Sequence, residues 1–299
     1  MKFRFHGFTG LQDILQTEKI SAEEYAIKRE AFIAGQPEDA ILKELDRRIA
    51  VTRASIVKGI TVPQHSRSGL TRGAASAFYG SGRQLIDSDL YRRAVAYSLA
   101  INEVNACGGK IVAFPTAGSS GIVSGAIWAW WDTRHGEQGY ETPTMQEPPF
   151  PERLRGAFLV SSLAGVILAQ QATLSGAEGG CQAECGSAGA MAACALAWLE
   201  DMSLDECFSA AALSLKNSLG LACDPVAGLV EVPCVKRNAF IAVNALVAVD
   251  LTLAGIKSVI PFDEVVLAMK HIGDMMPANI KENAKGGLAA TPTGLAVVL

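Results

Sequence analysis

The chain has 299 residues, of which 49% are hydrophobic, so it can fill the core of one large domain or of two small ones. Only 19% of its residues are charged, the formal net charge is −4 and no basic block is present, which argues against a nucleic-acid partner. Seven cysteines, an odd number, and an N-terminus without the apolar core of a signal peptide predict reduced thiols and a cytoplasmic location. The most apolar windows, 157–169 and 239–254, are short or interrupted, so we expect buried helices and no membrane span.

Residues 11–53 are charged and helix-forming, with apolar side chains at helical spacings. They predict a helical N-terminal arm, 1–55, packed on the core. Between 59 and 82 the chain is rich in Gly, Ser, Thr and Pro, which is typical of a loop and leaves His65 as a polar tip. Residues 89–106 predict a helix that ends at the following glycines.

The next segment, 110–126, is a short apolar run that leads into a turn of Thr, Ser and Gly residues. Backbone N–H groups and hydroxyls in such a turn could bind a carboxylate before the next helix starts. Residues 128–151 are polar and contain four prolines after position 142, so we interpret them as an insert that forms a surface loop.

The second half of the chain predicts helices separated by Gly or Pro: 157–174, 182–199, 204–219, 238–254 and 262–276. Strand-like runs are few and short, and no alternation of strands and helices is evident. An all-α fold is therefore predicted, with 1–299 forming a single domain. The glycine-rich tail, 286–294, is expected to be a loop that returns to the site.

Three cysteines lie at junctions between apolar helical runs and breaks that contain Gly or Pro. Cys181 follows three glycines and begins an Ala-rich helical run, where unpaired N–H groups favour thiolate, the form that binds metals. Cys223 lies in Ala-Cys-Asp-Pro and Cys234 in Val-Pro-Cys-Val. Sulfurs from three separate segments could therefore converge on one centre.

The alternative for any single cysteine is a free buried thiol, because cysteine packs as a small hydrophobic residue. Cys107, Cys194 and Cys207 favour that alternative. Cys185 is harder to assign, since it lies one helical turn from Cys181, and zinc or an iron cluster could use both. The chain has no Cys-x-x-Cys repeat of ferredoxin or zinc-ribbon type, so local spacing alone is a weak signal.

Five sequence blocks, in order along the chain, resemble the alpha chain of the iron–sulfur-dependent L-serine dehydratases. They are His65-Ser-Arg-Ser-Gly, Pro115-Thr-Ala-Gly, the run from Gly176 to Ala188, the run from Cys223 to Cys234, and the run from Gly287 to Gly294. The resemblance implies deamination of L-serine to pyruvate and ammonia, in amino-acid catabolism and gluconeogenesis. It also implies a [4Fe–4S] cluster held by Cys181, Cys223 and Cys234, without pyridoxal phosphate.

Family members pair this region with a beta region, which the sequence does not contain, so we expect a separate beta chain and an oligomer. Three protein ligands would leave one iron open to act as a Lewis acid on the substrate hydroxyl, while a positioned base removes the α-proton. His65 is the candidate base, because its pKa suits proton transfer near neutrality; a solvated loop histidine is the alternative.

Several polar side chains are candidates for binding the substrate carboxylate or ammonium group: Ser66, Ser68, Thr116, Ser119, Ser120 and Lys236. Turn formation and helix capping are the alternatives for the hydroxyl residues, and a solvated helix start is the alternative for Lys236 and its neighbour Arg237. Glu231, close to Cys234, suits orientation of a metal ligand better than catalysis.

Three rival functions remain open. A pyridoxal-phosphate enzyme would need a Schiff-base lysine, and Lys216 lies within a predicted helix without accompanying strands. The cysteines could instead hold zinc in a non-catalytic subunit. A related cluster lyase could act on cysteine or threonine, since one or two pocket side chains would change the substrate.

Overall fold

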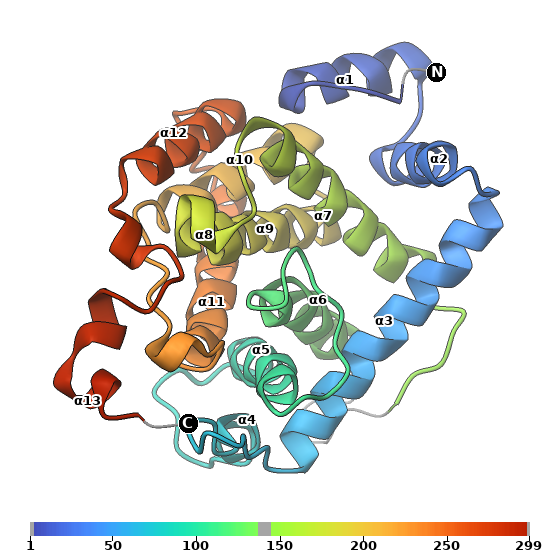
Figure 1. The fold of residues 1–299 in the computed structure, drawn as a ribbon. Helices are drawn as coiled ribbons and strands as arrows, with labels where there is room; N and C mark the ends of the chain where they lie inside the picture. Colours follow the sequence, from blue (N-terminus) through green and yellow to red (C-terminus); the bar gives the residue numbers. More distant parts are fainter. Residues whose placement is uncertain (1–2, 137–144, 298–299) are drawn as a thin grey trace.

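The chain is built from helices, and the all-α prediction is confirmed. The computed structural model describes residues 3–136 and 145–297, and no β-strand occurs within those ranges (Figure 1). Extended pairing there is confined to two isolated bridges, His65 with Arg72 and Cys223 with Lys281. Helices therefore bury the core, and loops carry the segments that contain the predicted site residues.

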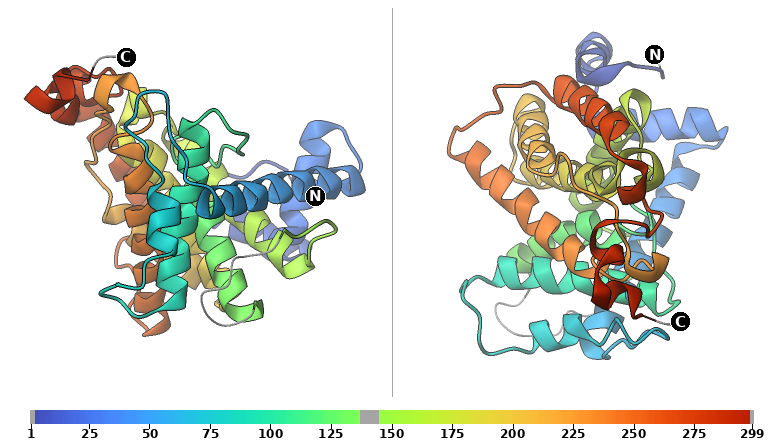
Figure 2. Two further views of the ribbon diagram at one scale, coloured as in Figure 1. Left: turned by 90° about the horizontal axis from the view of Figure 1, so that it is seen from below. Right: turned by 60° about the vertical axis from the view of Figure 1, so that its left-hand side comes forward.

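Three helices form the N-terminal part: α1 (Gly7–Glu18), α2 (Ala22–Ala34) and α3 (Glu38–Thr61). Their helical character was predicted, but α3 continues beyond residue 55 along the core (Figure 2, left). A Cβ at Gly59 would lie 2.6 Å from Ala100 of α5 (Asp89–Ala106), so the two helices pack in direct backbone contact. Helix α3 therefore continues without a break past residue 55, where the predicted arm ends.

Helix α5 has the predicted bounds, and Ser88 caps it by accepting a hydrogen bond from the backbone N–H of Tyr91. It follows the short helix α4 (Ala74–Tyr79) and packs against α6 (Ser120–His135). A Cβ at Gly121 would lie 2.2 Å from the Ser98 carbonyl oxygen. Glycine at this position therefore sets how close the two helices come.

The predicted surface loop at 128–151 is wrong for its first part, because α6 continues to His135. Trp128 is fully buried and donates a hydrogen bond from Nε1 to Thr52 Oγ1 (2.9 Å). Asp132, which gave the segment its polar character, is buried and accepts from Arg53 Nη1 at 2.7 Å. Residues 137–144 lie outside the described part of the chain, and 145–151 lead without helix into α7.

The rest of the chain up to residue 275 forms long helices joined by short helical turns, with α9 at their centre. Their bounds are α7 (Glu152–Gln171), α8 (Gly176–Gly179), the π-helical turn η1 (Gln182–Gly186), α9 (Ser187–Leu199), α10 (Leu204–Lys216), η2 (Val226–Gly228), α11 (Cys234–Leu253) and α12 (Phe262–Met275). Every residue of α9 except Trp198 is buried, and α6, α7, α10 and α11 all pack on it (Figure 1). Its many alanines allow this close packing.

Helix α7 is the one described helix that is long and apolar enough to cross a membrane by length and composition. Of its most apolar window, 67% is buried inside the protein, where it packs against α2 and α9. A core helix passes the same test, so the finding is weak evidence for a membrane span.

The C-terminal tail consists of three short helices, η3 (Ala278–Ile280), η4 (Gly287–Ala290) and α13 (Pro292–Leu295). It runs beside the loop that precedes α11 (Figure 2, right). The backbone N–H of Cys223 donates to the Ile280 carbonyl (2.9 Å), and the N–H of Glu282 donates to the Cys223 carbonyl (2.7 Å). The tail therefore returns to one of the predicted metal cysteines.

Replacing Asp132 tests the buried end of α6. The carboxylate accepts hydrogen bonds from Arg53 and from the Tyr97 hydroxyl (2.8 Å), so Asp132→Ala removes the anion from a buried cation. We expect the free energy of unfolding in urea to fall by about 3–5 kcal/mol. As a control, Asp201→Ala breaks an exposed pair with Arg153 and should cost less than about 1 kcal/mol. Equal losses would contradict the assignment.

Candidate metal centre

Cys181 lies at the start of η1, as the sequence predicted, and its side chain is buried. The preceding Gly180 has a φ of +75°, and a Cβ there would lie 2.8 Å from Met276 Sδ and 3.0 Å from the Leu221 carbonyl oxygen. Glycine is required by both the backbone conformation and the space. The close approach brings the Cys181 turn against the loop that leads to Cys223.

Gln182 fixes the π turn in place. Its Nε2 donates to the carbonyls of Gly179 (3.0 Å) and Met269 (2.9 Å), and its Oε1 accepts from the Gly220 N–H (2.9 Å). The side chain is fully buried, and these bonds tie the π turn to α8, to α12 and to the loop after α10. Such turns within helices are frequently found at functional sites.

Cys223 is held in an irregular loop by the tail. Besides the two backbone bonds to residues 280 and 282, Asp224 Oδ2 accepts from the Leu288 N–H (2.8 Å). Asp224 also pairs with Arg237 of α11 at 3.5 Å. The loop with the second cysteine is thus joined to both the tail and α11.

Cys234 is the first residue of α11, and Asn238, one turn later, ties this helix start to α6. Asn238 Nδ2 donates to the carbonyls of Cys234 (3.0 Å) and Gly118 (2.8 Å). Its Oδ1 accepts from the Gly121 N–H (3.1 Å). The third cysteine therefore lies beside the Thr/Ser/Gly turn before α6.

The buried sulfurs interact with one another. Interactions with the thiols of Cys185 and Cys223 and with the Arg237 guanidinium stabilise the Cys181 thiolate and hold its pKa well below the usual range. The same interactions between the thiols raise the pKa of Cys185 and of Cys223, and burial raises that of Cys234 to about 12. One sulfur therefore carries the negative charge unless a cation enters. A metal group would supply that cation, so the donor set fits one.

Glu184 also belongs to this centre, although the sequence analysis missed it. One of its carboxylate oxygens lies 3.8 Å from Cys223 Sγ, and the other would lie 3.6 Å from a Cβ at Gly118. Burial and the Cys181 charge raise the Glu184 pKa to about 7. Ligand atoms of Glu184, Cys223 and Glu282 lie within 4.8 Å of one another. Its position three residues after Cys181, on the same side of a helical run, was a usable signal.

The Thr/Ser/Gly turn lies against Glu184. Thr116 Oγ1 and Ser119 Oγ are 2.8 Å apart, and the Ser119 N–H donates to Thr116 Oγ1. Ser120 is fully buried, and its hydroxyl has no hydrogen-bond partner among the described residues. Of the predicted substrate-binding residues, these three are the ones that the structure brings to the cysteine centre.

The serines of the loop that contains His65 were expected to bind a ligand, but in the structure their hydroxyls bind a carboxylate of the protein. Ser66, Ser68 and Thr71 all donate to the Glu231 carboxylate, at 2.6, 2.7 and 2.7 Å. The His65 side chain is exposed. Glu231 thus links this loop to the segment before Cys234, and no hydrogen bond between described residues joins His65 to a cysteine.

Lys236 and Arg237 are neighbours at the start of α11, but their side chains lie in different surroundings. Lys236, the predicted residue, is exposed, and its charge acts on Glu103. Arg237 is partly buried, donates to the Ala222 carbonyl (2.8 Å) and helps to lower the pKa of Cys181 through its positive charge. Of these two cations, both considered from the sequence, Arg237 acts on the Cys181 sulfur, and Lys236 stays a prediction.

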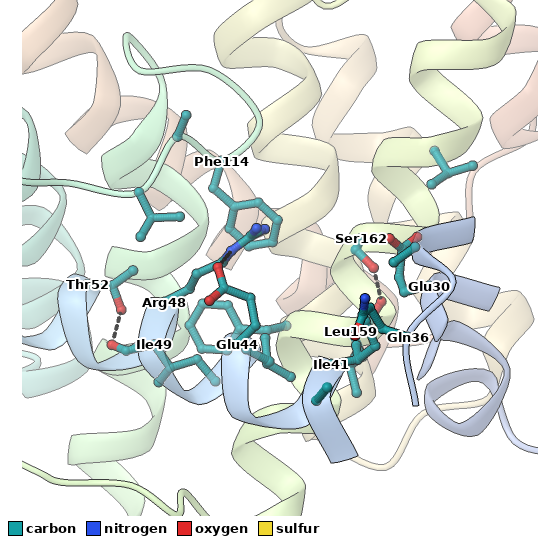
Figure 3. Close-up of a pocket in the computed structure, with 17 residues that line it drawn as sticks. Glu30, Gln36, Ile41, Glu44, Arg48, Ile49, Thr52, Phe114, Leu159 and Ser162 are labelled. Carbon is teal, nitrogen blue, oxygen red and sulfur yellow. Dashed lines mark hydrogen bonds and ion pairs between the residues drawn. The ribbon is translucent and has the colours of Figure 1, made fainter. Parts of the chain in front are cut away.

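A cavity of about 610 Å³ lies elsewhere, between α3, α7 and residues 112–114 (Figure 3). Phe114 points into it, with Glu44 and Arg48 of α3 on the opposite wall. None of the seven cysteines and none of the predicted substrate residues lines it. This cavity is therefore separate from the candidate metal centre.

Comparison with known proteins decides the family. Residues 7–289 match the model of the protein family described as "Serine dehydratase alpha chain". The chain belongs to the serine dehydratase alpha chain family. It is 41% identical over 293 residues to "Probable L-serine dehydratase, alpha chain" of Bacillus subtilis, covering 97% of this chain and 93% of that protein. It is 39% identical over 285 residues to "L-serine dehydratase, alpha chain" of Peptoniphilus asaccharolyticus, covering 94% and 93%.

Some members of this family are longer. "L-serine dehydratase 1" of Escherichia coli is 38% identical over 194 residues, which cover 64% of this chain but only 40% of that protein. The resemblance inferred from the five sequence blocks is thus confirmed, and in some relatives the shared region is part of a larger polypeptide.

The role of Gln182 can be tested by its effect on stability. Gln182→Ala leaves the Gly220 N–H and two buried carbonyls without these partners, so we expect the free energy of unfolding to fall by about 3 kcal/mol. Urea unfolding followed by circular dichroism measures the change. The control is Asn283→Ala, which removes an exposed bond to the Ala278 carbonyl and should cost less than about 0.5 kcal/mol.

Proposed function

We propose that the chain deaminates L-serine to pyruvate and ammonia, using a [4Fe–4S] cluster bound by Cys181, Cys223 and Cys234. The proposal is supported by the burial of these cysteines in three separate segments, by the electrostatic effect of the Cys181 sulfur on Cys223 and Cys234, and by the Asn238 bonds that join the Cys234 helix start to a turn rich in N–H and hydroxyl groups. The printed names of the relatives support the substrate. Held by three cysteines, such a cluster supplies an open iron that acts as a Lewis acid.

The residues around the cysteines have distinct tasks in this proposal. Arg237 compensates negative charge on sulfur, since its positive charge helps to lower the pKa of Cys181. The Thr116 to Ser120 turn binds the substrate carboxylate, because α6 begins there and the Ser120 hydroxyl is buried without a described partner. Ser66 and Ser68 remain predicted substrate contacts, which would require them to exchange Glu231 for the substrate. Lys236 remains a predicted contact at the rim.

His65 is the proposed base that accepts the α-proton. It is exposed and lies in a loop that Glu231 fixes next to the segment before Cys234. Closing the site would strengthen its electrostatic interactions and limit loss of protons to water. We propose that a separate beta chain covers this side and completes the site, in keeping with the name "alpha chain" of the relatives and with the longer protein of Escherichia coli.

A cytoplasmic location is part of the proposal, because the buried cysteines must stay reduced. Zinc binding by a non-catalytic chain is the rival that the same thiols permit. Anaerobic analysis of iron, acid-labile sulfide and zinc in the purified chain separates the two. Iron and sulfide in equal amounts support the lyase, whereas zinc without sulfide would overturn it.

Substitution of each ligand tests the cysteine set. Cys181→Ala, Cys223→Ala and Cys234→Ala should each abolish the visible cluster absorption and formation of pyruvate from L-serine. Cys194→Ala is the matched control, because Cys194 is fully buried within α9 and should leave both intact. Full activity and absorption in a Cys223→Ala protein would refute the ligand set.

The need for a beta chain is tested by anaerobic co-expression. The alpha chain alone should bind iron and sulfide but form little or no pyruvate, and the co-expressed pair should be active. Exposure to air should inactivate the pair, since an open iron is accessible to oxygen. Equal activity of the isolated alpha chain and the pair would contradict the proposed partner.

A further inference from the structure

The outward face of α11 is apolar over most of its length. Phe240, Val247 and Leu251 lie on this face at helical spacing, and their side chains are 76%, 51% and 37% exposed. Asn244, the polar residue among them, binds inward, because its Nδ2 donates to the Ser214 carbonyl of α10 (2.9 Å). The helix runs along the outside of the helical assembly (Figure 2, right). A continuous exposed apolar surface marks an interaction site.

A groove of about 400 Å³ lies beside this apolar face, between α10 and α11. Leu213 of α10 lines one side, and Val247, Ala248 and Leu251 of α11 line the other. Phe240 lies two turns before Val247, about 10 Å along the helix axis, so it does not line the groove of its own chain. The groove can therefore receive an aromatic side chain from another molecule.

Charges of opposite sign flank the apolar face. Lys236 lies one turn before Phe240. Asp250 lies about one turn after Val247, and both charged side chains are exposed. Neither side chain makes an ion pair or a hydrogen bond with another described residue. In a helix with 3.6 residues per turn, both project to the same side of the apolar face, about 21 Å apart along the axis. They are too far apart to pair with each other.

A second copy of α11 that runs antiparallel to the first matches the groove and the charges together. With a twofold axis beside Val243, Phe240 lies opposite the partner's Val247 and reaches the partner's groove. The Lys236 side chain then lies beside the partner's Asp250, and symmetry repeats both contacts at the other end. A twofold contact must be self-complementary, because the same surface forms both sides. The apolar face of α11 meets this requirement.

We propose that the apolar face of α11 is the contact between two copies of this chain in a twofold symmetric dimer. Exposed apolar side chains continue past the helix at Ile256 and Val259, and they enlarge the contact toward the roughly 800 Å² that each partner gives to a stable interface. The inference goes beyond the proposed function, because it rests on no cysteine and no bound substrate. The partner's Asp250 would also orient Lys236, a predicted substrate contact, at the rim of the candidate site.

Measurement of mass tests the dimer. Sedimentation equilibrium of the full chain at micromolar concentration should give twice the chain mass of 31.4 kDa. Phe240→Asp places a charge against the partner's groove and should weaken dimerisation at least about 100-fold, as loss of an aromatic anchor does. Circular dichroism should show unchanged folding, because Phe240 is exposed in the single chain. Phe32→Asp is the matched control: Phe32 lies on α2, is 64% exposed and should leave the dimer intact.

Exchange of charges tests the antiparallel arrangement. Asp250→Lys places like charges together at both ends of the contact and should weaken dimerisation about tenfold. Lys236→Asp combined with Asp250→Lys restores opposite charges, so the affinity should return to within about twofold of the unaltered chain. Failure of the double variant to recover would overturn the proposed arrangement of the two helices.

Three further outcomes would overturn the inference. The first is a monomeric unaltered chain, and the second is a dimer that Phe240→Asp leaves intact. The third is a complex of one alpha and one beta chain, obtained by co-expression, that Phe240→Asp disrupts, because the apolar face would then belong to the beta chain. None of these outcomes bears on the proposed cluster, which the analysis of iron and sulfide tests separately.

Discussion

Buried polar side chains that bind loop backbone hold the cysteine segments together, and the rest of the centre depends on them. Helices satisfy their own N–H and C=O groups, but the loops around Cys223 and Cys234 cannot. Gln182, Asp224 and Asn238 supply those bonds, each joining two or more segments. Removing one of these side chains would leave a buried backbone group unpaired and would also displace a cysteine.

Shared negative charge is the second constraint on the centre. Four thiols in a buried space cannot all ionise next to Glu184 without positive charge, and Arg237 supplies one guanidinium. The pKa of Cys181 is lowered and the pKa values of the other three thiols are raised, so the negative charge is favoured on Cys181. This arrangement is suited to receiving a cationic group, because each thiol that loses its proton then gains a metal bond.

Much of the fold could be predicted from the spacing of apolar residues and from helix-breaking residues. The candidate site could be predicted only in part from the local composition. The bounds of α5 were predicted residue for residue, and Cys181 and Cys234 do begin helical segments. The exposed loop expected from 128 onward was wrong, because the partner that buries Asp132, Arg53, lies far away in the sequence. From sequence alone, a polar residue is predicted to be exposed, because a partner that lies far away in the sequence cannot be recognised.

The same limit applies to individual side chains at the centre. Lys236 and Arg237 are adjacent and alike in charge, and only the direction of α11 determines which one faces the sulfurs. Likewise, the serines beside His65 were predicted to bind a ligand, but in the fold the Glu231 carboxylate occupies their hydroxyls. The residue types indicated which segments form the centre, but only the three-dimensional packing shows which side chains contact one another.

The pairing of Cys223 with the tail makes the shape of its loop depend on a distant part of the chain. The backbone partners of this cysteine, Ile280 and Glu282, belong to a segment that packs apart from helices α5, α6 and α9. These helices bury one another without that segment, but the loop around Cys223 cannot form its backbone bonds until the segment is in place. A break in the chain before residue 280 would therefore disturb the Cys223 loop while the helical core stays folded.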